Sequence, residues 1–568
     1  MLKKTRLVNP VHDLSLATTA DLAVDFISAD KPAGLTTHTS LNDSDRKKPW
    51  IDSHDGLLEW LGVRIGETLF PIHRLDRETT GVILFARSKE AAAKAREWFE
   101  SREIEKTYYF LTDHTTQHDS FTRSSRIERV GNAYISDHRS DSELAAGSPA
   151  NSETHFEKVR SQGRFTLWRA KPSTGKPHQI RLHAEDAGLP LLGDSLHGGS
   201  DFPTLCLHSG QLKLPGGKSY EAPLPIYFED LNLLDDRRLV RWLAAVDRRE
   251  RTLRSVKPFS DNTSTIRWIH TEGDPLRIEQ LGTVVNLNWF RDTFPTEDEW
   301  RSIEKLLRLK KWTQWYLQIR ADRGRDPHTD RALESLDLPP PARWTARENT
   351  LEFEFRRETG LSPGLFLDQR RNRAWLASQI KPGESRVLNL FCYTGGFSLA
   401  AAHAGAKQTV SVDVSKPFLD WSKSNFELNG ISTAPVSPDV PSAYEFRSMD
   451  AGEYLAWAAK KELKFDFIVC DPPSFARTNT RGKSSVFRIE TEFESLLKGC
   501  LKVARSGTRI LFSTNFEQWS LDQFAALTEK TIKASVQPRA RLVPTPSPDL
   551  DFEMPRAPKN MKSLVIEV

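Results

Sequence analysis

The chain has 568 residues, which is too long for one hydrophobic core and predicts three or four domains. Hydrophobic residues make up 38% of the chain and charged residues 27%, a composition typical of soluble globular proteins that excludes a largely disordered chain. The net charge of +4 permits an RNA partner without requiring one, so any phosphate-binding surface has to be a local patch.

The four cysteines form neither a CxxC pair nor a spacing typical of metal sites: Cys206, Cys392, Cys470 and Cys500. We therefore expect neither a zinc site nor a disulfide framework, and this cysteine usage fits a reducing cytoplasm. The first residues carry two lysines with no apolar run behind them, so we expect no secretory signal. No stretch approaches the roughly 18 apolar residues of a membrane span, and we expect a cytoplasmic protein without a membrane partner.

Residues 1–235 have the pattern of a mixed α and β domain with many short strands. The run 81–86 is almost wholly apolar and of strand length, which predicts a buried strand. Residues 91–101 have a helical pattern. Residues 140–152 are rich in Ser, Asp, Gly and Pro, which predicts a flexible loop.

Residues 236–262 are highly charged and predict a helix followed by a linker, and residues 263–345 predict a small α+β middle domain. The elements predicted in the middle domain are strands at 265–270, 282–288 and 312–319 and a helix at 297–309 with Thr296 as its N-cap. The prolines at 339–341 exclude a helix interior and predict a second linker, at 338–345.

Tryptophans crowd this middle domain at Trp268, Trp289, Trp300, Trp312 and Trp315. They are either a platform for RNA bases or the core of a small domain, and we favour the core for most of them. Three arginines follow, at Arg320, Arg323 and Arg325, and they either bind phosphates or form a solvated face.

From residue 346 to 568, strands and helices alternate, which predicts a doubly wound parallel sheet with helices on both faces. The predicted strands are 387–391, 409–413, 465–470 and 509–512, with a helix at 398–404. The fold class is therefore multidomain, α+β and α/β, with a Rossmann-like C-terminal domain.

Four short blocks of the first domain each contain charged residues: Asp30–Leu35, His73–Gly81, Glu105–Tyr108 and Gly175–His183. In this order, and followed by Gly193-Asp194 and Leu207-His208, they resemble the RluA-type pseudouridine synthases over most of residues 20–215. The second block alone is a weak signal, whereas the ordered set is specific.

The resemblance implies a mixed-sheet domain that isomerises uridine to pseudouridine without a cofactor. In such a reaction a carboxylate either attacks ribose C1′ or removes a proton at C2′, and the sequence does not separate these routes. The target base also has to leave its stack. The resemblance places the catalytic aspartate on Asp76 and the base-displacing arginine on Arg74. It places the tyrosine that stacks on the flipped uridine on Tyr108, and the cation that holds Asp76 ionised on Arg181.

Two positions depart from the family pattern without removing a predicted catalytic residue. Pro177 stands where threonine is usual, and His197 stands where tyrosine is common. Taken alone, Asp76 is more simply a loop aspartate that caps a turn or pairs with Arg74, and only the ordered blocks favour catalysis. We expect no RNA-binding S4 module before this half, because Asp25 already starts the catalytic pattern. RNA would then be gripped elsewhere.

A second group of residues, in the last domain, fits a nucleoside cofactor bound at the carboxyl edge of the sheet. Gly395 and Gly396 follow the first strand and allow the loop to approach a ligand closely. Asp413 ends the second strand, where its carboxylate can accept hydrogen bonds from both ribose hydroxyls. Asp450 can bond an adenine amino group.

Asp471–Pro473 ends a later strand, and the two prolines fix the backbone so that groups around Asp471 can hold an acceptor base. Phe475 follows at a distance suited to stacking on that base.

Four blocks of the last domain resemble the class I SAM-dependent large-subunit ribosomal RNA methyltransferases of the 7-methylguanosine branch: 364–370, 389–395, 412–415 and 418–430. The resemblance implies S-adenosylmethionine (SAM) as the cofactor and large-subunit rRNA, or an assembly intermediate, as the partner. It implies cofactor contacts at Gln369, Arg370, Asn389, Phe391, Tyr393, Gly395, Asp413, Asp450 and Asp471, with Asp471 also catalytic.

Two methylation chemistries occur in this broad group. Cytosine C5 methylation needs a cysteine nucleophile, which the cytosine branch carries after the strand that follows Asp-Pro-Pro. Here that stretch, 511–516, holds no cysteine. Guanine N7 already has a lone pair, so positioning it against the methyl sulfonium is largely enough. We favour guanine N7 over cytosine C5.

Our main hypothesis is a bifunctional RNA enzyme with both sites active on rRNA. One alternative keeps a single active half and uses the other for docking RNA. A second is a non-enzymatic ribosome assembly factor, and a third makes the C-terminal half a protein or small-molecule methyltransferase. The target nucleotides, the order of the reactions and the oligomeric state stay open.

Overall fold

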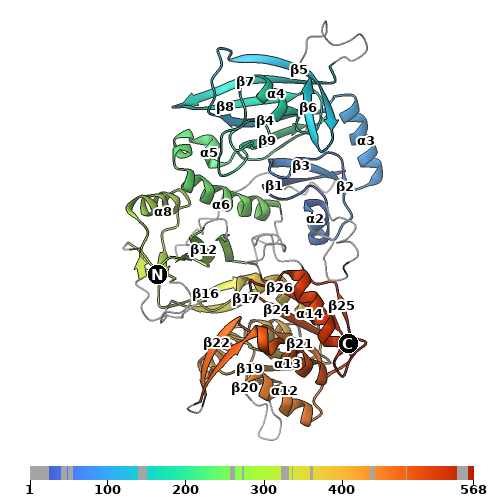
Figure 1. The fold of residues 1–568 in the computed structure, drawn as a ribbon, viewed down its shortest axis with the longest axis vertical. Coiled ribbons are helices and arrows are strands. Elements are labelled where there is room, and N and C mark those ends of the chain that lie inside the picture. Colours follow the sequence, from blue (N-terminus) through green and yellow to red (C-terminus); the bar gives the residue numbers. More distant parts are fainter. Residues whose placement is uncertain are drawn as a thin grey trace, which may run out of the picture.

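The computed structural model describes residues 25–39, 48, 56–137, 150–255, 263–270, 274–320, 332–335, 337–357, 362–434, 442–480, 483–546 and 561–568. The chain folds into three parts that follow one another along the longest axis of the molecule (Figure 1). Most of the loop predicted at 140–152 and all of the linker predicted after Ser255 lie outside the described residues.

The first part is built on a mixed sheet, which comprises ten strands among the described residues. Nearly all neighbouring strands are antiparallel, but β3 and β9 run parallel. Across the sheet the order is β1 (Phe26–Lys31), β3 (Thr80–Ala86), β9 (Leu207–Lys213), β4 (Glu105–Thr112), β8 (Phe165–Pro172), β7 (Ser152–Gln162), β5 (Ser120–Val130) and β6 (Ala133–Asp137), with β2 (Phe70–Pro71) on β3 and β10 (Ser219–Glu221) on β9. All of β3 is buried, which confirms the strand predicted at 81–86.

The helices of this part are short, and the predicted helix at 91–101 is confirmed as α3. They are α2 (Leu57–Ile65), α3 (Lys89–Glu100), α4 (Gln179–Asp186), α5 (Ile226–Glu229) and the 3-10 turn η1 (Leu231–Asp235).

Helix α6 (Arg237–Ser255) connects the first part to the middle part and confirms the helix predicted in the charged segment. Although α6 is rich in charged residues, one of its faces is apolar and includes Trp242 and Val246, both almost fully buried. This face belongs to one hydrophobic core that also contains Leu111 of β4 and Trp289 of the middle part. The first and middle parts therefore share a core, and α6 runs through it.

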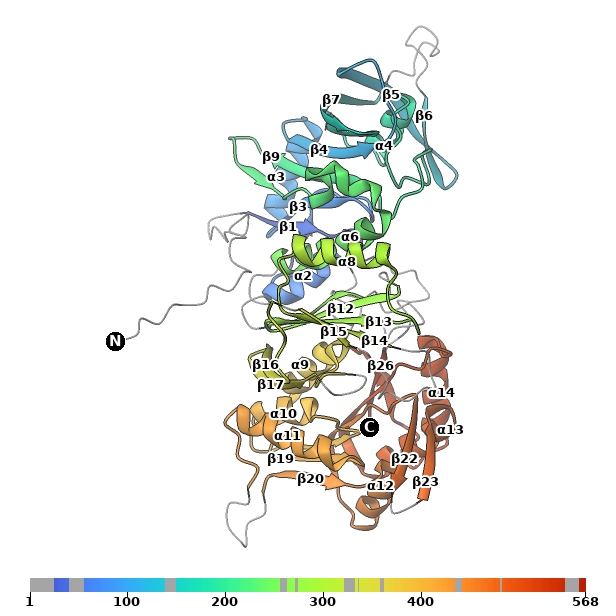
Figure 2. The same ribbon diagram turned by 90° about the vertical axis from the view of Figure 1, so that its left-hand side faces the viewer.

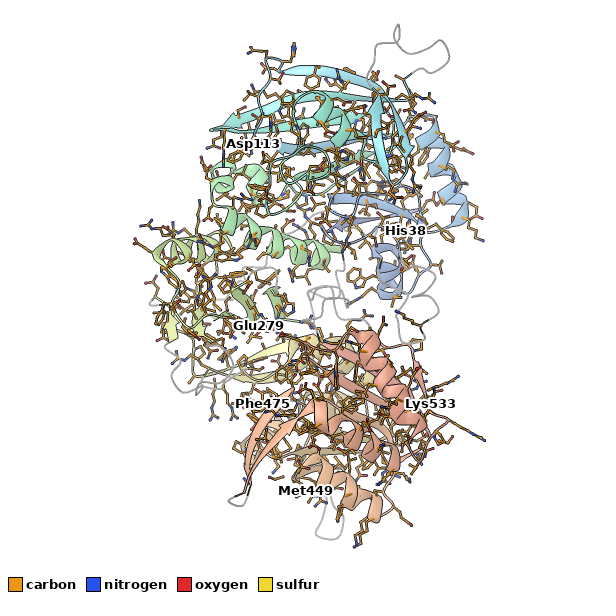
Figure 3. The ribbon with its side chains drawn as sticks, in the orientation of Figure 1. His38, Asp113, Glu279, Met449, Phe475 and Lys533 are labelled. Carbon is orange, nitrogen blue, oxygen red and sulfur yellow. The ribbon has the colours of Figure 1, made fainter. Side chains whose placement is uncertain are left out.

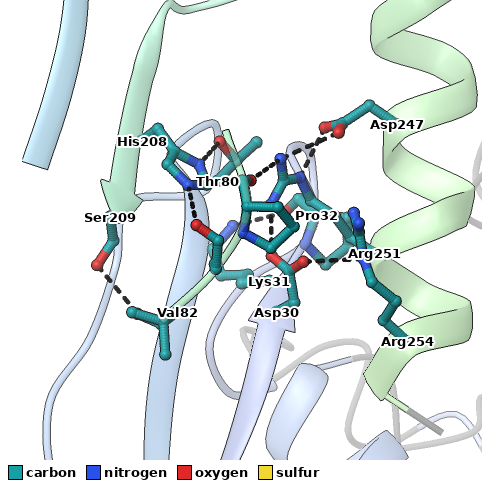
Figure 4. Close-up of polar contacts among 12 residues, drawn as sticks. Asp30, Lys31, Pro32, Thr80, Val82, His208, Ser209, Asp247, Arg251 and Arg254 are labelled. Atoms are coloured by element: carbon teal, nitrogen blue, oxygen red, sulfur yellow. Dashed lines mark hydrogen bonds and ion pairs between the residues drawn. The ribbon is translucent and has the colours of Figure 1, made fainter. Parts of the chain in front are cut away.

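A buried ion-pair network fastens α6 to β1 (Figure 4). Arg251 of α6 is fully buried and donates to Asp30 Oδ1 of β1 over 2.5 Å and to Asp247 Oδ2 over 2.6 Å. Ser255 accepts a further hydrogen bond from the Asp30 backbone N–H. Burial alone would lower the pKa of Arg251, but the Asp247 and Asp30 carboxylates outweigh it and raise that pKa.

The middle part is a small α+β unit whose sheet lies between α6 and α8 on one side and the start of the last part on the other (Figure 2). Its strands, in order, are β11 (Thr265–Ile269), β12 (Leu276–Leu281), β13 (Val284–Trp289), β14 (Trp315–Ile319) and β15 (Ala332–Glu334). Thr296 caps α8 (Glu297–Leu309) in a capping box with Glu299, as predicted.

Two strand boundaries predicted in this part are wrong. The strand expected from Gly282 begins at Val284, because Gly282 adopts a left-handed backbone (φ 69°) in the turn that joins β12 to β13. The strand expected from Trp312 begins at Trp315, after a turn in which Lys311 is also left-handed (φ 55°).

The tryptophans confirm the core interpretation. Trp268 and Trp289 are buried, and the other three pack against the same core. Arg320 is buried as well and donates to Asn288 Oδ1 over 2.9 Å, whereas Arg323 and Arg325 lie outside the described residues.

The last part begins with the hairpin β16 (Arg343–Glu348) and β17 (Leu351–Arg356), so the boundary placed between 345 and 346 falls inside a strand. A doubly wound sheet follows, as predicted, with β26 antiparallel between two parallel neighbours. Its order is β20 (Tyr444–Ser448), β19 (Gln408–Asp413), β18 (Arg386–Leu390), β21 (Phe465–Cys470), β24 (Ala504–Thr514), β26 (Lys562–Glu567) and β25 (Arg541–Val543).

The remaining helices belong to this part: η4 (Leu367–Gln369), α9 (Arg370–Gln379), α10 (Gly396–His403), α11 (Lys416–Leu428), α12 (Ala451–Lys460), α13 (Ile489–Lys502) and α14 (Leu521–Lys533). The helix predicted at 398–404 corresponds to α10. Within the described ranges, none of the helices has the length and apolar content needed to cross a bilayer.

Replacing Arg251 with alanine removes the main cation from two buried carboxylates, Asp247 and Asp30. We expect the free energy of unfolding to fall by about 3–5 kcal/mol, as when one partner of a buried ion pair is deleted. Urea denaturation followed by tryptophan fluorescence measures the change. Arg241→Ala, on the exposed face of the same helix, is the matched control and should stay within about 0.5 kcal/mol of wild type. Equal, small effects of the two substitutions would contradict the structural role of the network.

Candidate active sites

Asp76 lies in the loop between β2 and β3, and neighbouring residues hold this loop from both sides. The Thr37 hydroxyl bonds both the N–H and the C=O of Leu75, each over 3.2 Å. The Leu84 N–H of β3 donates to His73 Nε2 over 3.0 Å. Because burial lowers the pKa of His73 to about 3, its ring stays neutral and can accept this bond.

Lys31 holds the other end of the same loop (Figure 4). Its buried ammonium donates to the carbonyls of Arg77, over 2.7 Å, and Pro32, over 2.9 Å. Burial lowers the pKa of Lys31 to about 7, although the charges of Glu78 and Asp76 oppose the shift. Since Lys31 ends β1, the loop that carries Asp76 is tied to the strand that α6 holds.

Arg181 of α4 reaches Asp76, as the motif order predicted. Its Nη1 lies 3.3 Å from Asp76 Oδ2, while Nε and Nη2 bind both oxygens of Asp194 over 2.7 and 2.6 Å. Burial would lower the pKa of Arg181, but the hydrogen bonds and charges of Asp194 and Asp76 raise it. Asp194 therefore fixes the guanidinium in place, a function that its own short motif did not reveal.

The two other residues predicted for this site, Tyr108 and Arg74, differ in their exposure to solvent. Tyr108 of β4 is only 9% exposed, and burial raises its pKa to about 12 although the hydroxyl hydrogen-bonds Ser209. Arg74 is exposed and lies near enough to His178 to lower the pKa of that ring. The stacking role of Tyr108 and the base-displacing role of Arg74 stay predictions.

The second site is built on the loop after β18, whose backbone is left-handed at three positions in five: Phe391 (φ 54°), Tyr393 (φ 50°) and Gly395 (φ 79°). The loop is tied to the end of β19, because Asp413 accepts hydrogen bonds from the N–H of Tyr393 (3.0 Å) and of Ser415 (2.9 Å). Burial raises the pKa of Asp413, while these two N–H donors oppose the shift.

Packing gives one reason for a glycine at position 395, and the close approach to a ligand that the sequence indicated stays a prediction. A Cβ at this position would lie 1.8 Å from the Ser422 hydroxyl of α11, and the left-handed backbone also disfavours other residues. Close packing of the loop on α11 therefore explains the glycine.

Several residues with predicted cofactor contacts make internal hydrogen bonds instead of pointing freely outward. Asn389 donates to Ser398 over 3.0 Å, and the Tyr393 hydroxyl donates to the Ser362 carbonyl over 2.7 Å. Arg370 donates to the Thr265 carbonyl of the middle part over 2.5 Å. The cofactor roles of Asn389, Tyr393 and Arg370 stay predictions.

Asp450 caps α12, since its Oδ1 accepts from two backbone N–H groups of the first turn over 2.8 and 3.1 Å. Asp450 is exposed, and both of these hydrogen bonds go to the same oxygen. This position suits a hydrogen bond to an adenine amino group, which stays a prediction.

Asp471 follows β21 at the carboxyl edge of the sheet. Burial raises its pKa to about 7, and the charge of Asp368 adds to the shift. The nearby Gln369 amide and the charge of Arg373 oppose it. Gln369 is thus beside Asp471, as the shared cofactor prediction for these two residues requires.

Phe475 begins a hairpin of β22 (Phe475–Thr480) and β23 (Lys483–Arg488) and is 48% exposed. On β23, Phe487 packs against Phe391, with 5.5 Å between the ring centroids, so the hairpin lies against the loop of the second site. Figure 3 shows Phe475 in the C-terminal part, well below Asp113 of the first part along the long axis.

The four cysteines of the chain are all free and buried. Cys470 lies in β21 and contacts Cys500, and burial raises its pKa far above the ordinary value. Within the described ranges, no three His, Cys, Asp or Glu side chains cluster in a way that could hold a metal.

The donor and acceptor groups of the second site fit SAM. A buried carboxylate at the end of β19, Asp413, suits a ribose diol, because each of its oxygens retains acceptor capacity beyond its one amide partner. Asp450 follows β20 and Asp471 follows β21, so both lie at the carboxyl edge of the same sheet, with β19 and β18 between their strands.

Comparisons with known proteins identify both halves. Residues 25–186 match the RNA pseudouridylate synthase family, and residues 270–514 match the S-adenosylmethionine-dependent methyltransferase family, whose match starts in the middle part. The chain therefore contains a pseudouridine synthase domain of the RluA type followed by a SAM-dependent methyltransferase domain.

Each individual relative or solved structure covers only part of the chain. Ribosomal RNA large subunit methyltransferase K of Neisseria meningitidis is 37% identical over 183 residues, 32% of this chain and 47% of that protein. A structure described as a SAM-dependent methyltransferase from Streptococcus mutans is 22% identical and covers 62% of this chain and 86% of its own, with a TM-score of 0.48.

The structure of human RNA pseudouridylate synthase domain containing 4 is 26% identical and covers 36% of this chain and 87% of its own, with a TM-score of 0.28. The chain spans less than half the length of the first curated relatives that it matches.

The raised pKa of Asp471 predicts a pH dependence of stability. Its pKa rises from 3.8 to about 7 on folding, so its contribution is fully present below pH 3.8 and is lost as the pH rises through 7. Thermal denaturation between about pH 6 and pH 8 should therefore show a smaller loss of stability for Asp471→Asn than for wild type. Glu427→Gln, an exposed carboxyl on α11, is the control and should keep the wild-type slope. A wild-type slope in Asp471→Asn would show that this carboxyl does not titrate in that window.

Proposed function

We propose that the chain is a bifunctional RNA-modification enzyme. Its first domain isomerises uridine to pseudouridine, and its last domain transfers a methyl group from SAM to a base, guanine N7, of large-subunit rRNA or an assembly intermediate. The observation that carries this proposal is the position of Arg181 between two carboxylates. The buried Asp194 holds the Arg181 guanidinium in contact with the partly exposed Asp76.

The synthase reaction would use Asp76 on the ribose of the target nucleotide. Asp76 either attacks C1′ or removes the C2′ proton, and both routes need the carboxylate held in one orientation. Arg181 supplies that orientation from 3.3 Å. Arg74, exposed on the same loop, would take the place of the displaced base, and Tyr108 would support the flipped uracil.

The methyltransferase reaction would use residues at the carboxyl edge of the second sheet. SAM supplies an electrophilic methyl group when bound. Asp413 would hold its ribose hydroxyls and Asp450 its adenine amino group, and the exposed ring of Phe475 would stack on the acceptor base near Asp471.

The burial of every cysteine supports guanine N7 over cytosine C5. A C5 reaction needs a thiolate that reaches C6 of the base, whereas Cys392, Cys470 and Cys500 of this half are enclosed in its core. The raised pKa values of Cys392 and Cys470 make thiolates there still less accessible. Free, buried thiols also fit a reducing compartment, and we place the protein in the cytoplasm.

Asp76→Asn should lower pseudouridine formation by at least about 100-fold, because the amide cannot act as base or nucleophile, and should leave methylation intact. Large-subunit RNA from a strain that lacks the protein is incubated with each purified variant, and both modified nucleosides are mapped by mass spectrometry. Asp119→Asn, a surface carboxylate of the same domain, is the control. Loss of both marks in Asp76→Asn, or of neither, would contradict two independent sites.

The methyl mark itself separates the remaining alternatives. We expect 7-methylguanosine that disappears in Asp471→Ala while pseudouridine persists. A 5-methylcytosine mark would overturn the N7 assignment. Tight RNA binding without either mark, unchanged in Asp76→Ala and Asp471→Ala, would favour an assembly factor, and methylation without RNA would favour a protein or small-molecule substrate.

Asp413→Asn should weaken SAM binding by about 10–100-fold, because each hydrogen bond to a charged acceptor contributes about 1.5–3 kcal/mol. Isothermal titration calorimetry measures the dissociation constant. The control is Asp420→Asn on the exposed face of α11. If the two variants bind SAM equally, Asp413 is not the ribose acceptor.

A further inference from the structure

A row of polar side chains leads from the surface to Asp76, and neither its sequence motif nor the family match assigns it a function. His178 Nε2 lies 3.9 Å from Asp76 Oδ2. On the other side of the same ring, His178 Nδ1 lies 3.0 Å from His197 Nε2. His197 Nδ1 in turn lies 3.4 Å from Glu185 Oε2, whose side chain is 41% exposed.

The backbone places these groups. His178 adopts a left-handed conformation (φ 56°) immediately before α4, which an L residue holds only at a cost. Glu185 lies near the end of the same helix. His197 follows Asp194, the residue that pins Arg181. One helix and one loop therefore carry both the relay and the guanidinium that contacts Asp76.

Glu185 lies closer to its ring (3.4 Å) than Asp76 does to His178 (3.9 Å), so we assign the tautomers of both rings from the Glu185 end. The Glu185 carboxylate can only accept, so it selects the proton on His197 Nδ1 and leaves His197 Nε2 as an acceptor. His178 must then donate from Nδ1, which leaves a lone pair on Nε2, the nitrogen that faces Asp76. The arrangement presents a neutral, basic nitrogen beside the carboxylate.

The surrounding charges support a neutral ring. Burial lowers the pKa of His178, and Arg181 and Arg74 lower it further while Asp76 and Asp194 oppose them. Burial also lowers the pKa of His197, with the same opposition from Asp194 and Asp76. The Tyr134 ring of β6 packs on His178 with 5.8 Å between centroids. Tyr108, with a pKa near 12, remains a phenol at neutral pH and is a poor base.

We propose that His178 is a second proton-transferring group of the synthase site, oriented by the positioning residues His197 and Glu185. This rests on the proposed synthase function. The C1′–N1 bond breaks and the C1′–C5 bond forms. His178 Nε2 then takes the proton that uracil C5 loses and returns one proton to N1. The isomerisation gains and loses no proton overall, so one group that starts and ends neutral completes it.

His178→Asn tests the proposal, because asparagine tolerates the left-handed backbone but its amide does not take up a proton at neutral pH. Single-turnover isomerisation is measured on large-subunit RNA from a strain lacking the protein, with protium or deuterium at uridine C5. We expect a rate about 100-fold below wild type and a C5 deuterium isotope effect larger than that of wild type. In His178→Gly, added imidazole should restore part of the rate.

Substitution of the positioning residues should lower the isomerisation rate less than substitution of His178 does. His197→Phe removes the acceptor of His178 and should lower the rate by roughly tenfold while changing the acid limb of the pH–rate profile. Glu185→Gln should change the same limb in the same direction. Leu196→Ala, at a side chain that is 70% exposed beside His197, is the matched control and should keep the wild-type rate and profile.

Different results would overturn the proton-transfer role of His178 and the synthase function on which it rests. If wild type forms pseudouridine, Asp76→Asn does not, and His178→Asn stays within about threefold of wild type with an unchanged isotope effect, the proton-transfer role is wrong and the synthase function stands. If wild type forms no pseudouridine, or Asp76→Asn still forms it, the proposed function falls and this inference falls with it.

Discussion

Arg251, buried in α6 between Asp30 and Asp247, is the interaction on which the arrangement of the rest depends. A fully desolvated guanidinium is costly unless its partners are fixed, so α6 has to sit on β1 in one register. From β1 the constraint passes through Lys31 to the loop of Asp76. The opposite, apolar face of α6 packs into the core that the first and middle parts share. One helix therefore positions a candidate active site and anchors the next domain.

A second group of buried charges lies at the start of the last part, and one of them, Arg370, contacts the middle part. Glu348 of the β16–β17 hairpin binds Arg373 of α9 through both oxygens, over 2.7 and 2.8 Å. Arg370, one turn earlier, reaches the Thr265 carbonyl in the middle sheet. The middle part thus contacts α6 on one face and the β16–β17 hairpin and η4 of the last part on the other (Figure 2). Its buried tryptophans pack in the core that it shares with α6, and they are therefore unavailable as a platform for RNA bases.

The sequence predicted the fold well wherever a motif and a periodic pattern coincided. Alternating strands and helices after residue 346 indicated the doubly wound sheet, and the ordered blocks brought Arg181 to Asp76. Strand starts were predicted wrongly where a left-handed residue turns the chain. Gly282 looks like the start of a strand but turns the chain between two. The missing Cβ of Gly395 makes room for Ser422, while its predicted cofactor contact stays a prediction. The relay through His178 and His197 depends on a left-handed residue that no periodicity reveals.

The two candidate sites occupy different domains and need different chemistry, so the central claim is that one chain performs two independent modifications. The most direct test incubates the purified full chain with large-subunit RNA from a strain lacking it, with and without SAM, and counts modified nucleosides by mass spectrometry. The account predicts pseudouridine in both reactions and 7-methylguanosine only when SAM is present. Pseudouridine that requires SAM, or a reaction in which either mark is missing with SAM present, would contradict it.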